Sequence, residues 1–203
     1  MAVHAPVLTQ SAPAMKQGAT PLHRIFGVLG MLGSPFLFLS FAVNGFQQGD
    51  SNRLGAALGL VFALGWLANV LGLRSLHAAG RRLPAAILLG VETVGVVLAC
   101  LFQVYEFVAP GSGGLLYTVT DIAWPLSMLL LLVTGIAVIR ARVFTGWLRF
   151  VPLGAALWLP LGIVEMGVLG ETVGQAIGGV HTMIGWFLLG YAIYRGGTLA
   201  ARG

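Results

Sequence analysis

Six long apolar stretches constrain this chain more than any other feature of its sequence. Each is close to the ~20 residues that a helix needs to cross ~30 Å of hydrocarbon. With 58% hydrophobic and only 8% charged residues, the chain lacks the charged surface of a water-soluble domain. The sequence therefore predicts an all-α polytopic membrane protein built as a six-transmembrane-helix bundle. The expected spans are 25–46, 54–73, 84–107, 115–139, 148–169 and 174–194.

Charge is segregated across these spans. Ten of the eleven basic residues fall on one side, none of the six acids joins them there, and only Arg53 falls on the other side. Lys and Arg accumulate in cytoplasmic loops, and an even number of spans returns the chain to its starting side, so both termini are predicted to be cytoplasmic. Short basic loops of this kind serve orientation and lipid headgroup contact, not nucleic-acid binding.

The same pattern divides the chain into three parts. A flexible cytoplasmic tail is expected at 1–23, the transmembrane domain at 24–195, and a second cytoplasmic tail at 196–203. The preponderance of Arg over Lys is typical of a bacterial genome rich in GC. The expected location is therefore a bacterial inner membrane.

Two short matches between the halves of the chain suggest an internal duplication. LGAAL at 54–58 recurs at 153–157, and GVET at 90–93 is echoed by GVHT at 179–182. Three spans per unit would make this a 3+3 inverted repeat, an arrangement that many transporters use. Coincidence in a chain rich in Gly, Ala and Leu is the alternative.

Small residues and prolines mark places where helices approach or bend. Glycines at helical intervals let helix backbones pack closely, and the predicted packing positions are Gly55, Gly59, Gly174, Gly178 and Gly185. Prolines inside spans free backbone carbonyls and kink helices, which applies to Pro35, Pro125, Pro152 and Pro160. A bend at Pro160, five residues before Glu165, points to a cavity.

Four ionisable residues lie within the predicted spans: Glu92, Asp121, Glu165 and His181. Each costs about 2.5 kcal/mol or more in hydrocarbon unless it has a partner, water or a neutral form. At ~1.5 Å per residue, the last three lie roughly 6 to 10 Å below the outer ends of their helices. Glu92 lies ~12 Å above the inner end of the third predicted helix, and this depth allows contact with His181.

One helical stripe in the third span joins Glu92 to two further polar residues. Val96, Ala99, Gln103 and Glu106 follow Glu92 at helical spacing, so this stripe is predicted to face the bundle interior. Gln103 and Glu106 thereby become candidates for ligand binding or proton coupling beside the four ionisable residues. The alternative is structural: Glu92 is a protonated acid bonded to a neighbour, and Gln103 and Glu106 emerge among the headgroups.

Cofactor sites have little support in the sequence. Asp121, Glu165 and His181 supply the donor types of a two-carboxylate, one-histidine metal site, but without the spacing of a known metal motif. Haem would need axial ligands, and His23 and His77 have no second pair across the bundle. A single cysteine, Cys100, excludes internal disulfides and thiolate clusters. No cofactor is required.

Three functions remain open at this stage. The first is a small inner-membrane protein that binds a small or lipophilic ligand, or moves a solute or proton, through an outward-facing polar cavity. The second is a membrane anchor or auxiliary subunit whose glycine-rich faces contact a partner subunit or a second copy. The third is an intramembrane metalloenzyme, which would require the metal site at Asp121, Glu165 and His181.

Overall fold

The computed structural model describes residues 21–47, 52–111 and 113–196, and within these ranges all regular structure is helical. Five segments are long and apolar enough to cross a membrane, and there are six if a bent pair of shorter helices is counted as one span. The prediction of an all-α chain with membrane-length apolar helices is confirmed.

The helices follow the predicted spans to within a few residues at each end. The first span consists of α1 (Pro21–Gly33) and α2 (Phe36–Val43). Three continuous helices follow: α3 (Arg53–Ser75), α4 (Leu83–Val108) and α5 (Leu115–Ala141). A short 3-10 helix, η1 (Gly146–Phe150), leads into α6 (Val151–Ala156) and α7 (Trp158–Leu169), and the last span is α8 (Glu171–Arg195).

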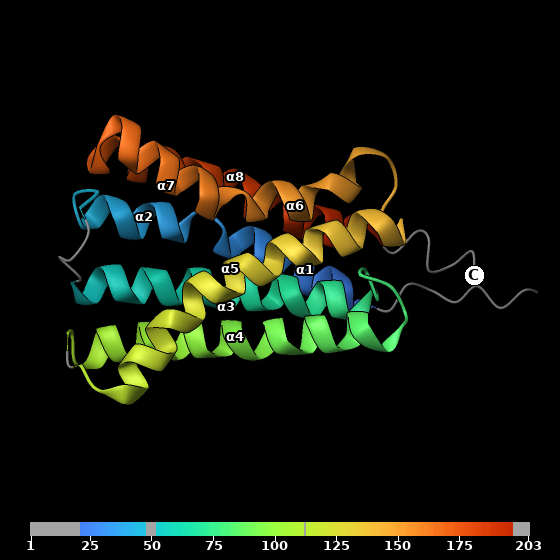
Figure 1. The fold of residues 1–203 in the computed structure, drawn as a ribbon, viewed down its shortest axis with the longest axis horizontal. Coiled ribbons are helices and arrows are strands. Elements are labelled where there is room, and N and C mark those ends of the chain that lie inside the picture. The colour runs from blue at the N-terminus through green and yellow to red at the C-terminus, as the bar shows by residue number, and fades with distance from the viewer. Residues whose placement is uncertain (1–20, 48–51, 112, 197–203) are drawn as a thin grey trace, which may run out of the picture.

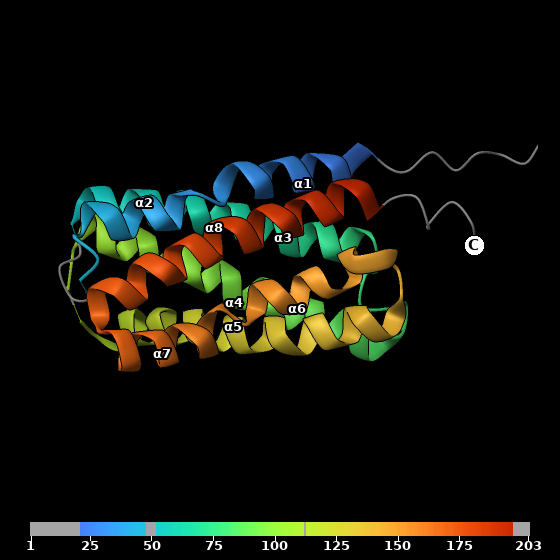
Figure 2. The same ribbon diagram turned by 90° about the horizontal axis from the view of Figure 1, so that it is seen from above.

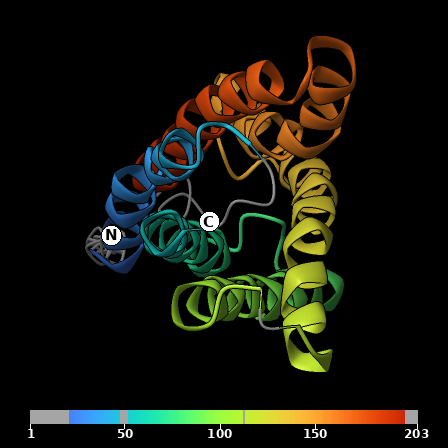
Figure 3. The same cartoon turned by 90° about the vertical axis from the view of Figure 1, so that its left-hand side faces the viewer.

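The spans form a ring in chain order. Each packs against the spans that precede and follow it, and α1 and α2 close the ring by packing against α8 (Figure 3). We call the end where α1 begins and α8 ends the terminal end of the bundle (Figures 1 and 2). The opposite end, where α2, α4 and α7 each end and the next helix begins, is the loop end.

Aromatic side chains fill the middle of the ring. Phe62 and Trp66 of α3, Trp124 of α5 and Trp186 of α8 pack with ring centroids 5.4 to 6.3 Å apart. Phe62, Trp66 and Trp186 are completely buried. Tilted and edge-on contacts of this kind suit the charge distribution of aromatic rings. We refer to these four residues as the aromatic plug, because they close the interior between the two ends.

Glycine pairs bring α1 into backbone contact with α3 and α8. A Cβ atom placed on Gly33 would lie 2.7 Å from the Cα of Gly65, and one on Gly190 would lie 2.6 Å from the carbonyl oxygen of Gly27. Only glycine allows backbones to approach this closely, and such contacts hold helices together where lipid removes the hydrophobic driving force.

Two spans are broken, each beside a proline. Pro35 follows the break between α1 and α2, and the fifth span bends by 50° between α6 and α7. Pro160 has no N–H to offer the carbonyl of Ala156, which favours the bend at this level. By contrast, α5 continues through Pro125. In a 3+3 inverted repeat span one would correspond to span four, and span five to span two, so these breaks give the predicted repeat no support.

Substituting Gly190 by Ala should lower the stability of the protein. The added methyl group would meet the backbones of Gly27 and Met31, and overpacking of this kind costs about 1–3 kcal/mol. Gly90→Ala is the matched control, because a Cβ there meets nothing within 4 Å. It should be neutral or stabilising by up to about 1 kcal/mol. Thermal unfolding in detergent compares the two, and equal melting temperatures would contradict the proposed backbone contact.

Candidate functional site

A cavity of about 510 Å³ lies at the loop end of the bundle. Side chains from α2, α3, α4, α5, α7 and α8 line it, and Trp124 of the aromatic plug belongs to its lining. The volume falls in the range of about 300–1,000 Å³ that is typical of small-molecule sites. The cavity is therefore large enough for an organic ligand.

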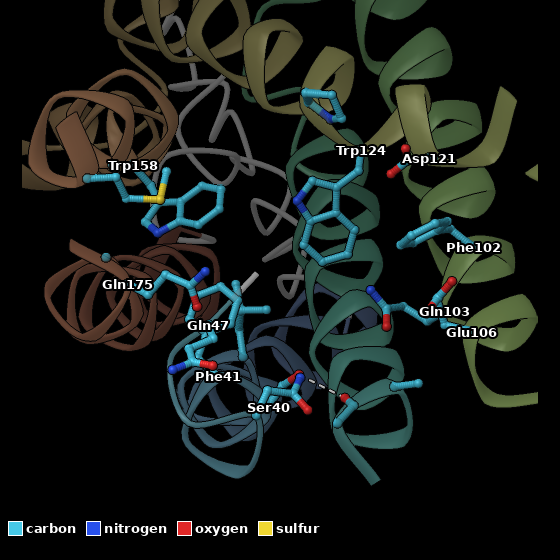
Figure 4. Close-up of a pocket in the computed structure, with 18 of the residues that line it drawn as sticks. Ser40, Phe41, Gln47, Phe102, Gln103, Glu106, Asp121, Trp124, Trp158 and Gln175 are labelled. Atoms are coloured by element: carbon cyan, nitrogen blue, oxygen red, sulfur yellow. Dashed lines mark hydrogen bonds between the residues drawn. The ribbon is translucent and has the colours of Figure 1, made fainter. Parts of the chain in front are cut away.

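One wall of the cavity carries three of the six predicted binding residues. Gln103 and Glu106 on α4 lie beside Asp121 on α5 (Figure 4). Glu106 is only 5% exposed, and its Oε1 accepts a 3.4 Å hydrogen bond from the backbone N–H of Gly111. Tyr117 of α5 lies close enough to interact with the same carboxylate. Asp121 is exposed and makes no hydrogen bond within the described part of the chain.

The facing wall adds polar groups that are not among the six predicted binding residues. Gln175 of α8 is 8% exposed, makes no hydrogen bond with any described residue, and turns its amide into the cavity (Figure 4). Trp158 of α7 lies next to Gln175. The Nε1 atom of Trp158 and the Oδ1 atom of Asn44 are both buried without a hydrogen-bond partner among the described residues. Buried polar atoms rarely stay unpaired. Other buried atoms without a described partner, such as Nε1 of Trp66 and of Trp186, lie away from the cavity. Those of Trp158 and Asn44 belong to its lining, where water or a polar ligand can reach them.

Glycines make room for the cavity's side chains. A Cβ on Gly55 would meet the amide of Asn44, one on Gly59 the amide of Gln103, and one on Gly178 the indole of Trp158. These three of the five predicted packing glycines therefore seat side chains that line the cavity. The other two lie at helix contacts, Gly174 against the backbone of Met166 and Gly185 against Ala155.

Glu92 lies outside this cavity. It is fully buried on α4 and accepts a hydrogen bond from the hydroxyl of Thr134 on α5, and its second oxygen has no partner among the described residues. The prediction that its helical stripe faces the interior is confirmed, because Val96 and Ala99 are also fully buried. These two residues separate Glu92 from Gln103, so the cavity stops short of it.

His181 and Glu165 do not line the cavity either. The Nε2 atom of His181 lies 2.9 Å from the carbonyl oxygen of Gly154, in a separate apolar groove between α6 and α8. Gly154 stands just before the bend, so this bond ties α8 to the broken span. Glu165 is half-buried on α7 and is not part of the lining. Contact between Glu92 and His181, which the depths allowed, is not formed.

No metal site assembles in the described ranges. Three or more His, Cys, Asp or Glu side chains do not gather anywhere among residues 21–47, 52–111 and 113–196. Asp121 lies in the cavity wall, whereas His181 bonds the backbone of α6. The structure therefore does not bring the three candidate ligands together.

Comparison with known proteins gives no relative. No protein-family model matches the chain, and no curated protein and no solved structure was found to be similar to it. The cavity has amides and carboxylates on its walls, aromatic rings beside them and the aromatic plug beneath. A function is inferred below from this geometry.

The pair formed by Glu92 and Thr134 should be structural, and a double-mutant cycle tests this. Thr134→Val would leave a buried carboxyl group without its partner, at a cost of about 1–3 kcal/mol. Adding Glu92→Leu to Thr134→Val should recover most of that loss, because replacing both polar partners by apolar groups is close to neutral. Chemical unfolding in detergent measures all three variants. A double mutant as unstable as the sum of the single mutants would contradict this role.

Proposed function

We propose that this protein binds a small ligand with an apolar body and polar groups in the cavity at the loop end. The observation that carries the proposal is the cavity itself, whose walls combine carboxylates, aromatic rings and amides such as that of Gln175, which makes no hydrogen bond with a described residue. The plug beneath it favours binding over passage, because Phe62, Trp66 and Trp186 are completely buried between the cavity and the terminal end.

The charge pattern supports a cavity that faces the outside of the cell. At the terminal end, Arg74 lies in the last turn of α3 and is followed by Arg81 and Arg82 before α4 begins. At the same end, Arg140 lies in the last turn of α5, Arg142 follows that helix, and Arg149 lies in η1. By the positive-inside rule this end is cytoplasmic. The loop end, with Arg53 as its only basic residue in the described part, is then the outer end, and a bacterial inner membrane is the proposed location.

The arrangement of α5 and α7 supports a ligand with an apolar body. Both helices line the cavity, yet they scarcely touch each other, because α5 packs against α4 and α6 (Figure 3). Their outer faces carry exposed apolar residues such as Ile122, Leu126 and Leu161. The cavity is thus bounded toward the lipid by two helices that do not interlock, which favours a ligand that partitions into the bilayer.

Accessibility of Gln175 tests the proposed orientation. In a Cys100→Ala background, Gln175→Cys should react with a small membrane-impermeant thiol reagent added to intact cells. Ile177→Cys is the control, because Ile177 lies two residues further along α8 and lines the separate groove instead of the cavity. It should stay unmodified, since a thiol in hydrocarbon does not ionise. Modification of Gln175→Cys only in inside-out vesicles would mean that the cavity faces the cytoplasm, and would contradict the proposed orientation.

Filling the cavity should abolish ligand binding without harm to the fold. Gly162 lines the cavity, and a Cβ on it meets nothing within 4 Å, so Gly162→Phe can place its ring in the empty volume. A panel of small amphiphiles is screened in nanodiscs for compounds that raise the melting temperature. A ligand at a hundred times its Kd should stabilise the protein by about 2.7 kcal/mol.

Gly167→Phe on the same helix provides the matched control. Gly167 is exposed, is not part of the lining, and also leaves open space for a side chain. Compounds that bind in the cavity should stabilise the wild type and Gly167→Phe but not Gly162→Phe. Equal stabilisation of all three proteins would place binding elsewhere and overturn the proposal.

A further inference from the structure

We propose that the ligand is an organic cation, an amine or quaternary ammonium with an apolar body, whose charge lies against Asp121 and Glu106. This inference rests on the proposed function, because it requires that the cavity binds a ligand. It adds the charge of the ligand and the residues that recognise it.

The charge of the cavity lining is negative. Asp121 and Glu106 both belong to it, and no Lys, Arg or His is found among its described residues. Two more acids, Glu165 and Glu171, lie at the loop end, against Arg53 as the only base in the described part of that end. An acidic site with apolar walls concentrates cations, because its low-dielectric surroundings focus the field.

Asp121 leaves its carboxylate available. It makes no hydrogen bond within the described ranges, and it lies in the cavity wall one turn from Tyr117. Glu106 is held more firmly, since it is only 5% exposed and accepts a hydrogen bond from the N–H of Gly111. A buried carboxylate needs a compensating partner. A cation between these two groups supplies one that the lining itself does not contain.

The remaining walls fit the rest of such a molecule. Phe41, Phe102, Trp124 and Trp158 line the cavity. Phe102 and Trp124 lie on the same side as the acids, and Trp158 lies on the opposite side (Figure 4). Aromatic faces attract alkylammonium groups as well as apolar bodies. The amide oxygens of Gln103 and Gln175 can accept hydrogen bonds from an amine N–H. Gln175 is nine-tenths buried and still unpaired among the described residues, so it points to a ligand independently of the acids.

Other ligand charges fit less well. An anion would face two carboxylates without a basic residue in the described lining to compensate them. A divalent metal would need more donors, and no group of three metal-binding side chains gathers in the described ranges. The geometry therefore favours a monovalent organic cation.

A set of isosteric probes tests this inference in nanodiscs, with binding followed by tryptophan fluorescence and thermal stabilisation against empty nanodiscs. Benzyltrimethylammonium is the cation, neopentylbenzene its neutral isostere and benzylsulfonate the anion. The cation should bind to the wild type most tightly. Asp121→Asn should weaken binding of the cation by about tenfold, as loss of a close charge pair does. The double substitution Asp121→Asn with Glu106→Gln should weaken it further. Glu165→Gln, an acid at the same end outside the lining, should leave its affinity unchanged.

Each outcome supports or overturns the inference. The cation and its neutral isostere could bind equally well to the wild type and both fail to bind to Gly162→Phe. This result would support the proposed function but overturn the inferred selectivity for a cation. Tighter binding of the sulfonate, or a cation affinity unaffected by the double substitution, would also overturn it. No binding by any of the three probes would remove the proposed function and this inference together.

A second measurement requires no choice of ligand. It compares two reagents on the same variant, so that a difference in folding between variants does not produce the result. Gln175→Cys in the Cys100→Ala background should react faster with a cationic methanethiosulfonate than with an anionic one, relative to free thiol. Asp121→Asn should reduce this ratio toward that of free thiol. A ratio that already equals the free-thiol value in the parent would contradict a negative cavity.

Discussion

Hydrocarbon offers no hydrogen bonds, so every polar side chain in this bundle has to find its partner inside the ring or at an end. The outer faces of the helices are accordingly apolar, and the polar residues turn inward: Asn69 donates to the backbone of Trp186, Thr134 to Glu92, and Ser40 to the backbone of Gly55. Where neighbouring helices pack closely, these groups pair with protein. Where the helices separate, as α5 and α7 do at the loop end, the same inward-facing groups are left lining a cavity.

Glycine acts in two distinct ways to produce this arrangement. Near the terminal end and the middle of the bundle, Gly27, Gly33, Gly65 and Gly190 bring backbones together and fix α1 against α3 and α8. Near the loop end, glycines such as Gly59 lie under polar side chains and give them room to lie flat against a helix. The first role closes the ring and the second shapes the walls of its open end. A larger side chain at the first kind of glycine would change the stability of the bundle. At the second kind it would change the shape of the cavity.

Hydropathy and helical periodicity predicted the features that depend on local sequence. The spans, and the inward face of α4 from Glu92 to Glu106, follow from the order of apolar and polar residues along one helix. The rotation of each helix about its axis, in contrast, depends on its neighbours. His181 therefore bonds Gly154 at the bend instead of entering the cavity, and Glu165 lies outside the lining although its depth was predicted to suit. Gln175 was missed because an amide costs less in a membrane than a charge does, so the search for ionisable residues passed over it.

Two carboxyl groups at different depths between α4 and α5 have different surroundings. Glu92 and Glu106 share a face of α4 and are both almost inaccessible. At Glu92 the partner is a hydroxyl on α5, and both residues of the pair are completely buried. At Glu106, nearly four turns further along, the neighbouring α5 residues are Tyr117 and Asp121, which has no hydrogen-bond partner among the described residues, and the space between the helices opens into the cavity. We therefore expect the acid at the closed helix contact to stabilise the bundle, and we propose that the acids beside the gap between α5 and α7 recognise a ligand.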